Sequence, residues 1–169
     1  METAVIDNGA GRVKSGMMGD QSPKSMSNCT GRMQKSMNVL VGDEVDAINN
    51  GSQLTYSRPF DRGYLVNWQI ESEIWTRLFD SHHMNISPAN HNLVVTEPPL
   101  NPTSLQEEMN EIIFEDYGFQ NYCRRPAAWF TGKTAILSKH DLRSSFISYM
   151  SLAVSPHLMT ITSQHTKVI

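Results

Sequence analysis

The chain has 169 residues, of which 39% are apolar and 18% charged, and its formal net charge of −3 is typical of a folded domain. The basic residues are scattered along the sequence and nothing indicates a dense basic face, so we expect no direct, sequence-specific binding of nucleic acid. No apolar run approaches the roughly 18 residues that span a bilayer, and no membrane partner is expected.

The first elements in the chain are predicted to be a β-hairpin and a small lobe. Residues 3–6 are partly β-branched and lead into Asp-Asn-Gly, a strong turn signal, and residues 12–17 supply a returning strand. Residues 20–57 are rich in Met, Ser, Asn and Gly and contain one clear apolar stretch, NVLVGDEV. This composition predicts a loop-rich lobe with one or two strands.

The middle of the chain shows a sharper pattern. Trp68, Trp75, Leu78 and Phe79 recur at helical spacing, and Asn67 can cap their helix, which predicts a helix over 68–80 with an apolar face in the core. The run HNLVVTE, between Asn90 and two prolines, predicts a buried strand over residues 91–97.

A second helix is predicted after Pro102, where Ser104 and Glu107 match a capping box and Gly118 supplies a stop signal. Its apolar face comprises Leu105, Met109, Ile112, Ile113 and Tyr117. Strands that alternate with helices predict an α/β fold in which helices cover a mixed sheet.

The composition changes near residue 130. Residues 131–169 contain a single acid, Asp141, and many Ser and Thr residues, and one amphipathic helix fits residues 142–154. We therefore divide the chain into residues 1–130, a folded part, and residues 131–169, a divergent tail that is irregular, either disordered or partly helical.

The turn after the first strand is the candidate binding site. Gly9 and Gly11 allow successive backbone N–H groups to approach one anion, and Lys14 follows on the outgoing strand. Asp7 could hold a hydrated metal that bridges phosphates. The alternative is a simple hairpin turn. No nucleophile elbow, paired acids or His-Glu-x-x-His pattern occurs, so we expect no enzyme and no catalytic residue.

Several stretches in sequence order resemble the amino-terminal part of the actin family over about residues 3–125. They are VIDNGAG, RPFDRGYLVNW, EIWTRLF, LVVTEPPLNP and MNEIIFEDYGFQ. The resemblance implies a partial actin-like, that is ribonuclease H-like, α/β fold with the hairpin at its start. It also implies that the glycine turn is the first phosphate-binding loop of that fold.

Within the family, SNCTGR, GYLVNW and IIFEDYGFQ are similar to the actin-related protein 6 subgroup. That resemblance implies a non-catalytic subunit of an SWR-type chromatin-remodelling complex, which exchanges a variant histone into nucleosomes. The implied partners are the other subunits of the complex and, indirectly, histones or the nucleosome. The implied location is the nucleus, with the cytoplasm as a second site.

The family resemblance assigns the nucleotide-contacting residues as Asp7, Asn8, Gly9, Ala10, Gly11 and Lys14. Asp7 matches the acid on the metal side of the nucleotide, and Ala10 stands where conventional actins carry serine. ATP is the implied cofactor of the full-length family, and we expect weak or absent binding by this chain. After Arg125 the residues cease to resemble the family, from which we expect a truncated product.

Two other hypotheses remain open. The chain could be a fragment of an actin-type ATP-binding or filament-forming cytoskeletal protein. Alternatively, it could be a small α/β module that binds an anion at the glycine turn through Lys14. Copurification with remodeller subunits, filament sedimentation and phosphate binding distinguish these hypotheses.

Overall fold

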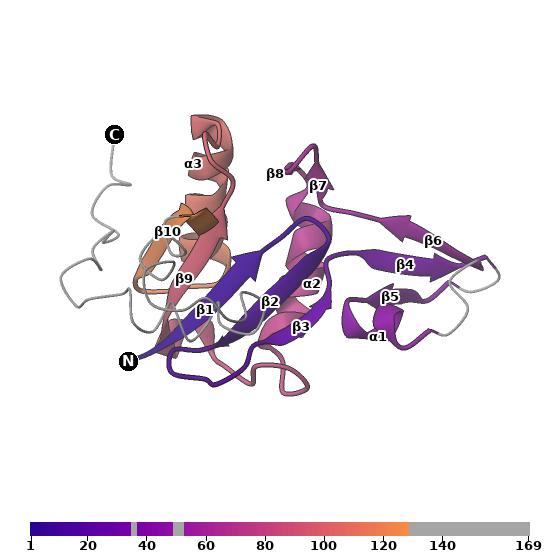
Figure 1. Ribbon diagram of the computed structural model, residues 1–169, viewed down its shortest axis with the longest axis horizontal. Coiled ribbons are helices and arrows are strands. Elements are labelled where there is room, and N and C mark those ends of the chain that lie inside the picture. Colours follow the sequence, from indigo (N-terminus) through magenta and orange to yellow (C-terminus); the bar gives the residue numbers. More distant parts are fainter. Residues whose placement is uncertain (35–36, 49–52, 129–169) are drawn as a thin grey trace, which may run out of the picture.

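The computed structural model describes residues 1–34, 37–48 and 53–128, and a five-stranded mixed sheet is its largest element (Figure 1). The strand order is β10-β9-β1-β2-β3. The strands are β1 (Glu2–Asn8), β2 (Arg12–Met17), β3 (Lys24–Ser27), β9 (His91–Glu97) and β10 (Tyr122–Pro126). β2 pairs antiparallel with β1 and with β3, whereas β9 pairs parallel with β1 and with β10. The predicted hairpin and the predicted strand at 91–97 are confirmed.

A smaller sheet lies to one side of the main sheet (Figure 1). Its strands, in the order β5-β4-β6, are β4 (Thr30–Met33), β5 (Val39–Val41) and β6 (Leu54–Ser57). The short helix α1 (Asp43–Asp46) follows β5, and β7 (Phe60–Asp61) and β8 (Tyr64–Leu65) form a hairpin. Residues 20–57 thus hold more strands than predicted, and the first of them, β3, pairs with the main sheet.

Helix α2 (Trp68–Phe79) agrees with the predicted helix to within one residue. The Asn67 side chain accepts a hydrogen bond from the Ile70 amide at 3.2 Å, so the predicted cap is confirmed. The helix buries the apolar face that its sequence spacing predicts, and Trp68 and Trp75 meet edge to face with ring centroids 5.5 Å apart.

Helix α3 (Thr103–Glu111) continues as a π-helical turn, η3 (Ile112–Asp116), and a 3₁₀ turn, η2 (Pro88–Asn90), precedes β9. The predicted capping box is wrong. The helix begins at Thr103, so Ser104 already has a helical backbone, and no side chain caps the helix. The apolar face is in the predicted place, and Met109 and Ile113 are buried.

One hydrophobic core joins the main sheet to its helices. It combines residues of β1, β2, β9 and β10 with the apolar faces of α2 and α3. This arrangement confirms the predicted α/β class with a mixed sheet covered by helices. Among the described residues, no helix is long and apolar enough to cross a membrane. The predicted helix at 142–154 and the tail at 131–169 lie outside the described residues.

Candidate phosphate-binding site

The six candidate residues lie together on the hairpin of β1 and β2. The register pairs Asp7 with Lys14 and Asn8 with Val13. Since β1 ends at Asn8 and β2 begins at Arg12, residues 9–11 form the connecting turn. The Gly9 amide donates to the Asp7 carbonyl at 3.0 Å, which bends the chain at the end of β1. The hairpin therefore presents the turn and both flanking charges at one edge of the main sheet.

The carbonyl groups of the turn are held by the protein. Asn28 donates to the Gly9 carbonyl from its side chain at 3.0 Å and to the Gly11 carbonyl from its backbone at 3.1 Å. Arg58 donates to the Ala10 carbonyl at 3.4 Å. Ala10 and Gly11 are exposed. Since the carbonyls are engaged, the exposed backbone amides of the turn are the groups that an anion could contact.

The two glycines of the turn differ in what the structure requires of them. A Cβ on Gly9 would lie 2.8 Å from the Arg12 carbonyl oxygen, closer than real Cβ atoms approach a backbone atom. A Cβ on Gly11 would meet no atom within 4 Å. Glycine is therefore needed at position 9 for the fold itself, whereas the space beside Gly11 is open.

We expect Gly9→Ala to lower the free energy of unfolding by about 1–3 kcal/mol, because the turn must shift to relieve the clash with Arg12. The matched control is Gly11→Ala, which adds the same methyl group in open space and should change the unfolding free energy by less than about 0.5 kcal/mol. Urea denaturation of both variants measures the difference. Equal losses for the two variants would contradict this account of the turn.

The charged side chains of the site pair with each other. Lys14 Nζ lies 3.3 Å from one carboxylate oxygen of Asp7, and the Thr96 hydroxyl donates to the other at 2.9 Å. The Asn8 amide donates to the same Thr96 oxygen at 3.0 Å. Thr96 on β9 thus fixes the end of β1, and an anion at the turn would compete with Asp7 for Lys14.

The carboxylate of Asp7 is the candidate metal-side group of the turn. Within residues 1–34, 37–48 and 53–128, no group of three or more His, Cys, Asp or Glu side chains could hold a metal ion. The resemblance implies that a metal would be held through water and the phosphates of the ligand. The assignment of Asp7 to the metal side stays a prediction.

An ion pair ties α1 of the small lobe to the start of β2. Arg12 contacts Asp46 of α1 at 3.0 Å, and Asp46 also accepts from the Ser27 amide at 3.0 Å and the Ser27 hydroxyl at 2.6 Å. Burial raises the pKa of Asp46, but the hydrogen bonds from Ser27 and Arg12 outweigh it and the pKa is lowered. The turn is thus braced from the small lobe as well as from β9.

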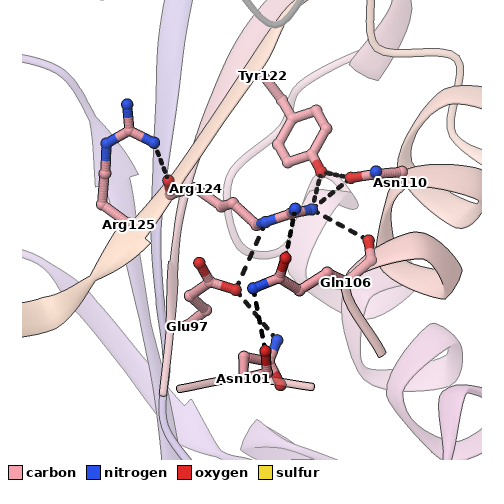
Figure 2. A network of polar contacts seen from close by, with 7 residues as sticks. All are labelled: Glu97, Asn101, Gln106, Asn110, Tyr122, Arg124 and Arg125. Carbon is pink, nitrogen blue, oxygen red and sulfur yellow. Dashed lines mark hydrogen bonds and ion pairs between the residues drawn. The ribbon is translucent and has the colours of Figure 1, made fainter. Parts of the chain in front are cut away.

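A second polar network surrounds Arg124 at the carboxyl ends of β9 and β10 (Figure 2). Arg124 Nε lies 3.5 Å from Glu97, and its Nη atoms donate to the carbonyl and side chain of Gln106, both at 3.0 Å. Asn110 accepts from both Arg124 and the Tyr122 hydroxyl. Burial raises the pKa of Tyr122 to about 12. The network joins α3 to both strands, which is a structural role.

Removal of the guanidinium should therefore destabilise the fold. The Arg124 and Glu97 side chains are only 15% and 9% exposed, so Arg124→Met leaves a buried carboxylate without its counterion. We expect a loss of about 2 kcal/mol in unfolding free energy. Arg32→Met, at an exposed position of β4, is the control. Equal denaturation midpoints for the two variants would contradict a structural role for the network.

The sequence did not identify three residues that shape the site. Thr96 and Asn28 contact the ends of β1 and the turn, and Arg58 contacts Ala10, although each lies far from the turn in sequence. Thr96 stands one residue after Val95, which pairs with Ile6. A correct register for the parallel strands β1 and β9 would have placed Thr96 beside Asp7. No local sequence signal marks Asn28 or Arg58.

Comparison with known proteins gives the family. The actin family model matches residues 1–140, which extends past residue 125, where the resemblance was expected to end. The chain is 43% identical over 126 residues to the actin-like protein ARP6 of Cryptococcus neoformans, an alignment that covers 73% of this chain and 26% of that protein.

Two further relatives are named actin-related protein 6. That of Neurospora crassa is 33% identical over 160 residues, which is 91% of this chain and 34% of the relative. That of Drosophila melanogaster is 34% identical over 125 residues, which is 73% of this chain and 31% of the relative. The chain thus spans about a third or less of the length of these relatives. Its match to the family model and the glycine hairpin lead to one conclusion: the chain belongs to the actin family.

Proposed function

We propose that this chain is the amino-terminal part of a non-catalytic, actin-related subunit of a nuclear SWR-type chromatin-remodelling complex that takes part in histone-variant exchange. The observation that carries the proposal is the similarity to relatives named actin-related protein 6 in several species. In this role the chain contacts other subunits of the complex and reaches histones or the nucleosome through them. A partner ATPase drives the exchange.

The chemistry of the turn supports a docking role over catalysis. Ala10 gives the turn a methyl group where a hydroxyl could contact a terminal phosphate. Lys14 is paired with Asp7 at 3.3 Å, so part of its interaction with a phosphate would be offset by the loss of that pair. The family implies nucleotide binding in its full-length members, and the exposed amides of the turn could contact a phosphate.

Copurification tests the proposed role. The tagged chain, expressed in cells and purified from nuclear extract, should bring down the subunits of a remodelling complex, identified by mass spectrometry against a tag-only control. The same preparation should stay in the supernatant when filaments are sedimented. Recovery in the filament pellet without remodeller subunits would contradict the proposal and favour an actin-type cytoskeletal protein.

We expect ATP to bind the 169-residue chain with a Kd weaker than about 1 mM, which corresponds to about −4 kcal/mol. The described residues provide one phosphate loop, so few contacts offset the translational and rotational entropy that a bound nucleotide loses. Isothermal titration calorimetry with ATP and Mg²⁺ measures the affinity. Micromolar binding would contradict this expectation and favour an ATP-binding function.

A further inference from the structure

Arg58 brings a basic side chain from the small lobe to the glycine turn. It directly follows β6, whose last residue, Ser57, pairs with Thr30 of β4. The next residue, Pro59, is buried, and its carbonyl accepts two backbone hydrogen bonds at 3.0 and 3.1 Å. A residue that precedes proline is restricted to an extended backbone. The backbone of Arg58 is therefore held on both sides, although the residue is exposed.

The guanidinium of Arg58 contacts the glycine turn. Its Nη1 donates to the Ala10 carbonyl at 3.4 Å, which is longer than a typical N–H···O bond, and both residues are exposed. Burial raises the pKa of the Cys29 thiol, and Arg58 lowers it more than any other charged group does. Because Cys29 follows Asn28, which holds the turn, the charge of Arg58 acts close to the turn.

The other two cations at the turn are already paired with carboxylates. Lys14 lies 3.3 Å from Asp7, and Arg12 lies 3.0 Å from Asp46. In the part of the chain that the structure describes, Arg58 forms no ion pair, and its hydrogen bond goes to a neutral carbonyl. The two pairs cancel, so the positive charge that remains at the turn is that of Arg58.

Arg58 can also contact an anion at a smaller cost than Lys14. An anion that draws Lys14 away leaves the Asp7 carboxylate, whose side chain is only 19% exposed, without its counterion. An anion that draws Arg58 away leaves the exposed Ala10 carbonyl, which water can satisfy. A guanidinium also presents five N–H donors in a planar fork that matches phosphate oxygens. These differences favour Arg58 over Lys14 as the group that attracts an anion.

We propose that Arg58 is an anion-binding residue of the glycine turn, where its guanidinium and the exposed turn amides contact a phosphate group together. The sequence offers Lys14 for this role because Lys14 lies close to the turn in the chain, whereas Arg58 reaches the turn from the small lobe. The ligand is a phosphate group, carried by a nucleotide or free in solution. The inference depends on the turn acting as a phosphate loop, and not on a role in a remodelling complex.

Titration of the ¹⁵N-labelled full chain with inorganic phosphate at constant ionic strength, followed by nuclear magnetic resonance, tests the proposal. The amides of Ala10 and Gly11 should shift as phosphate is added. In Arg58→Gln the Kd obtained from these shifts should rise about three- to fivefold, the size expected for one charge-assisted contact at an exposed site. Arg58→Lys keeps the charge and should restore most of the affinity. Arg32→Gln, which removes the same charge from an exposed position of β4, is the control and should bind like the wild type.

A parallel titration with ATP and Mg²⁺ distinguishes the two sources of the phosphate group. A lower Kd for ATP than for phosphate, with the same loss in Arg58→Gln, supports the proposal with a nucleotide as the ligand. Equal Kd values, again with the loss in Arg58→Gln, support it with free phosphate as the ligand.

The proposal is overturned if the turn amides of the wild type respond to neither phosphate nor ATP. It is also overturned if Arg58→Gln loses no more affinity than Arg32→Gln. Amide signals outside the turn that stay unchanged show that both variants are folded. None of these measurements involves a remodeller subunit, so their failure is distinct from a failure of the proposed function.

Discussion

Replacement of Trp75 by alanine is expected to lower the free energy of unfolding by about 3–5 kcal/mol. The side chain is completely buried, and its ring lies 5.5 Å from Trp68, 5.8 Å from Phe79 and 5.7 Å from Tyr117, measured between centroids. These contacts join α2 to the segment that follows α3. The truncation removes a large apolar surface from the core and leaves a cavity that the surrounding rings cannot fill.

Urea denaturation followed by far-ultraviolet circular dichroism measures this loss. Tyr56→Ala is the matched control, because Tyr56 is an aromatic residue of β6 with an exposed fraction of 46%. We expect the control to lose less than about 1 kcal/mol. A loss below 1 kcal/mol for Trp75→Ala would mean that the aromatic cluster is not the centre of the core.

Local signals predicted the elements that position the site. The spacing of the aromatic residues and Asn67 predicted α2, because a helix cap and an amphipathic stripe depend only on neighbouring residues. Asp-Asn-Gly predicted the hairpin for the same reason. The turn, its glycines and both flanking charges were therefore available from the sequence.

Contacts between residues far apart in the sequence could not be predicted from local signals. The partnership of Asn28 with the turn depends on where the chain returns after β3, and the sequence reveals only an Asn-Cys-Thr pattern there. The cap at Ser104 failed because Pro102 and Thr103 begin α3 earlier than the capping-box pattern suggests. Both cases depend on tertiary placement, which a short pattern does not encode.

The position of Glu71 in the sequence fits two different environments. As an acid in the first turn of α2 it fits a favourable interaction with the helix dipole. Yet it lies three residues after Trp68 and four before Trp75, so the spacing places it on the buried face between them. The structure shows that burial prevails, because the carboxyl is enclosed by the core and by the asparagines beneath the turn.

The Glu71→Gln variant should consequently be more stable than the wild type at alkaline pH. Folding raises the pKa of Glu71 from 4.5 to about 7, so the folded chain binds more protons than the unfolded chain between these values. The stability that Glu71 contributes is complete below pH 4.5 and is lost as the pH rises to about 7. The neutral glutamine does not lose it.

We expect the variant to exceed the wild type in unfolding free energy by about 1 kcal/mol at pH 5 and about 3 kcal/mol at pH 8, since each pKa unit corresponds to about 1.4 kcal/mol. Denaturation of both proteins across this range measures the difference, and the titration of every other group cancels in the comparison. Glu73→Gln should show no such trend, because its side chain is exposed. A difference between Glu71→Gln and the wild type that stays constant with pH would mean that Glu71 ionises equally in both states.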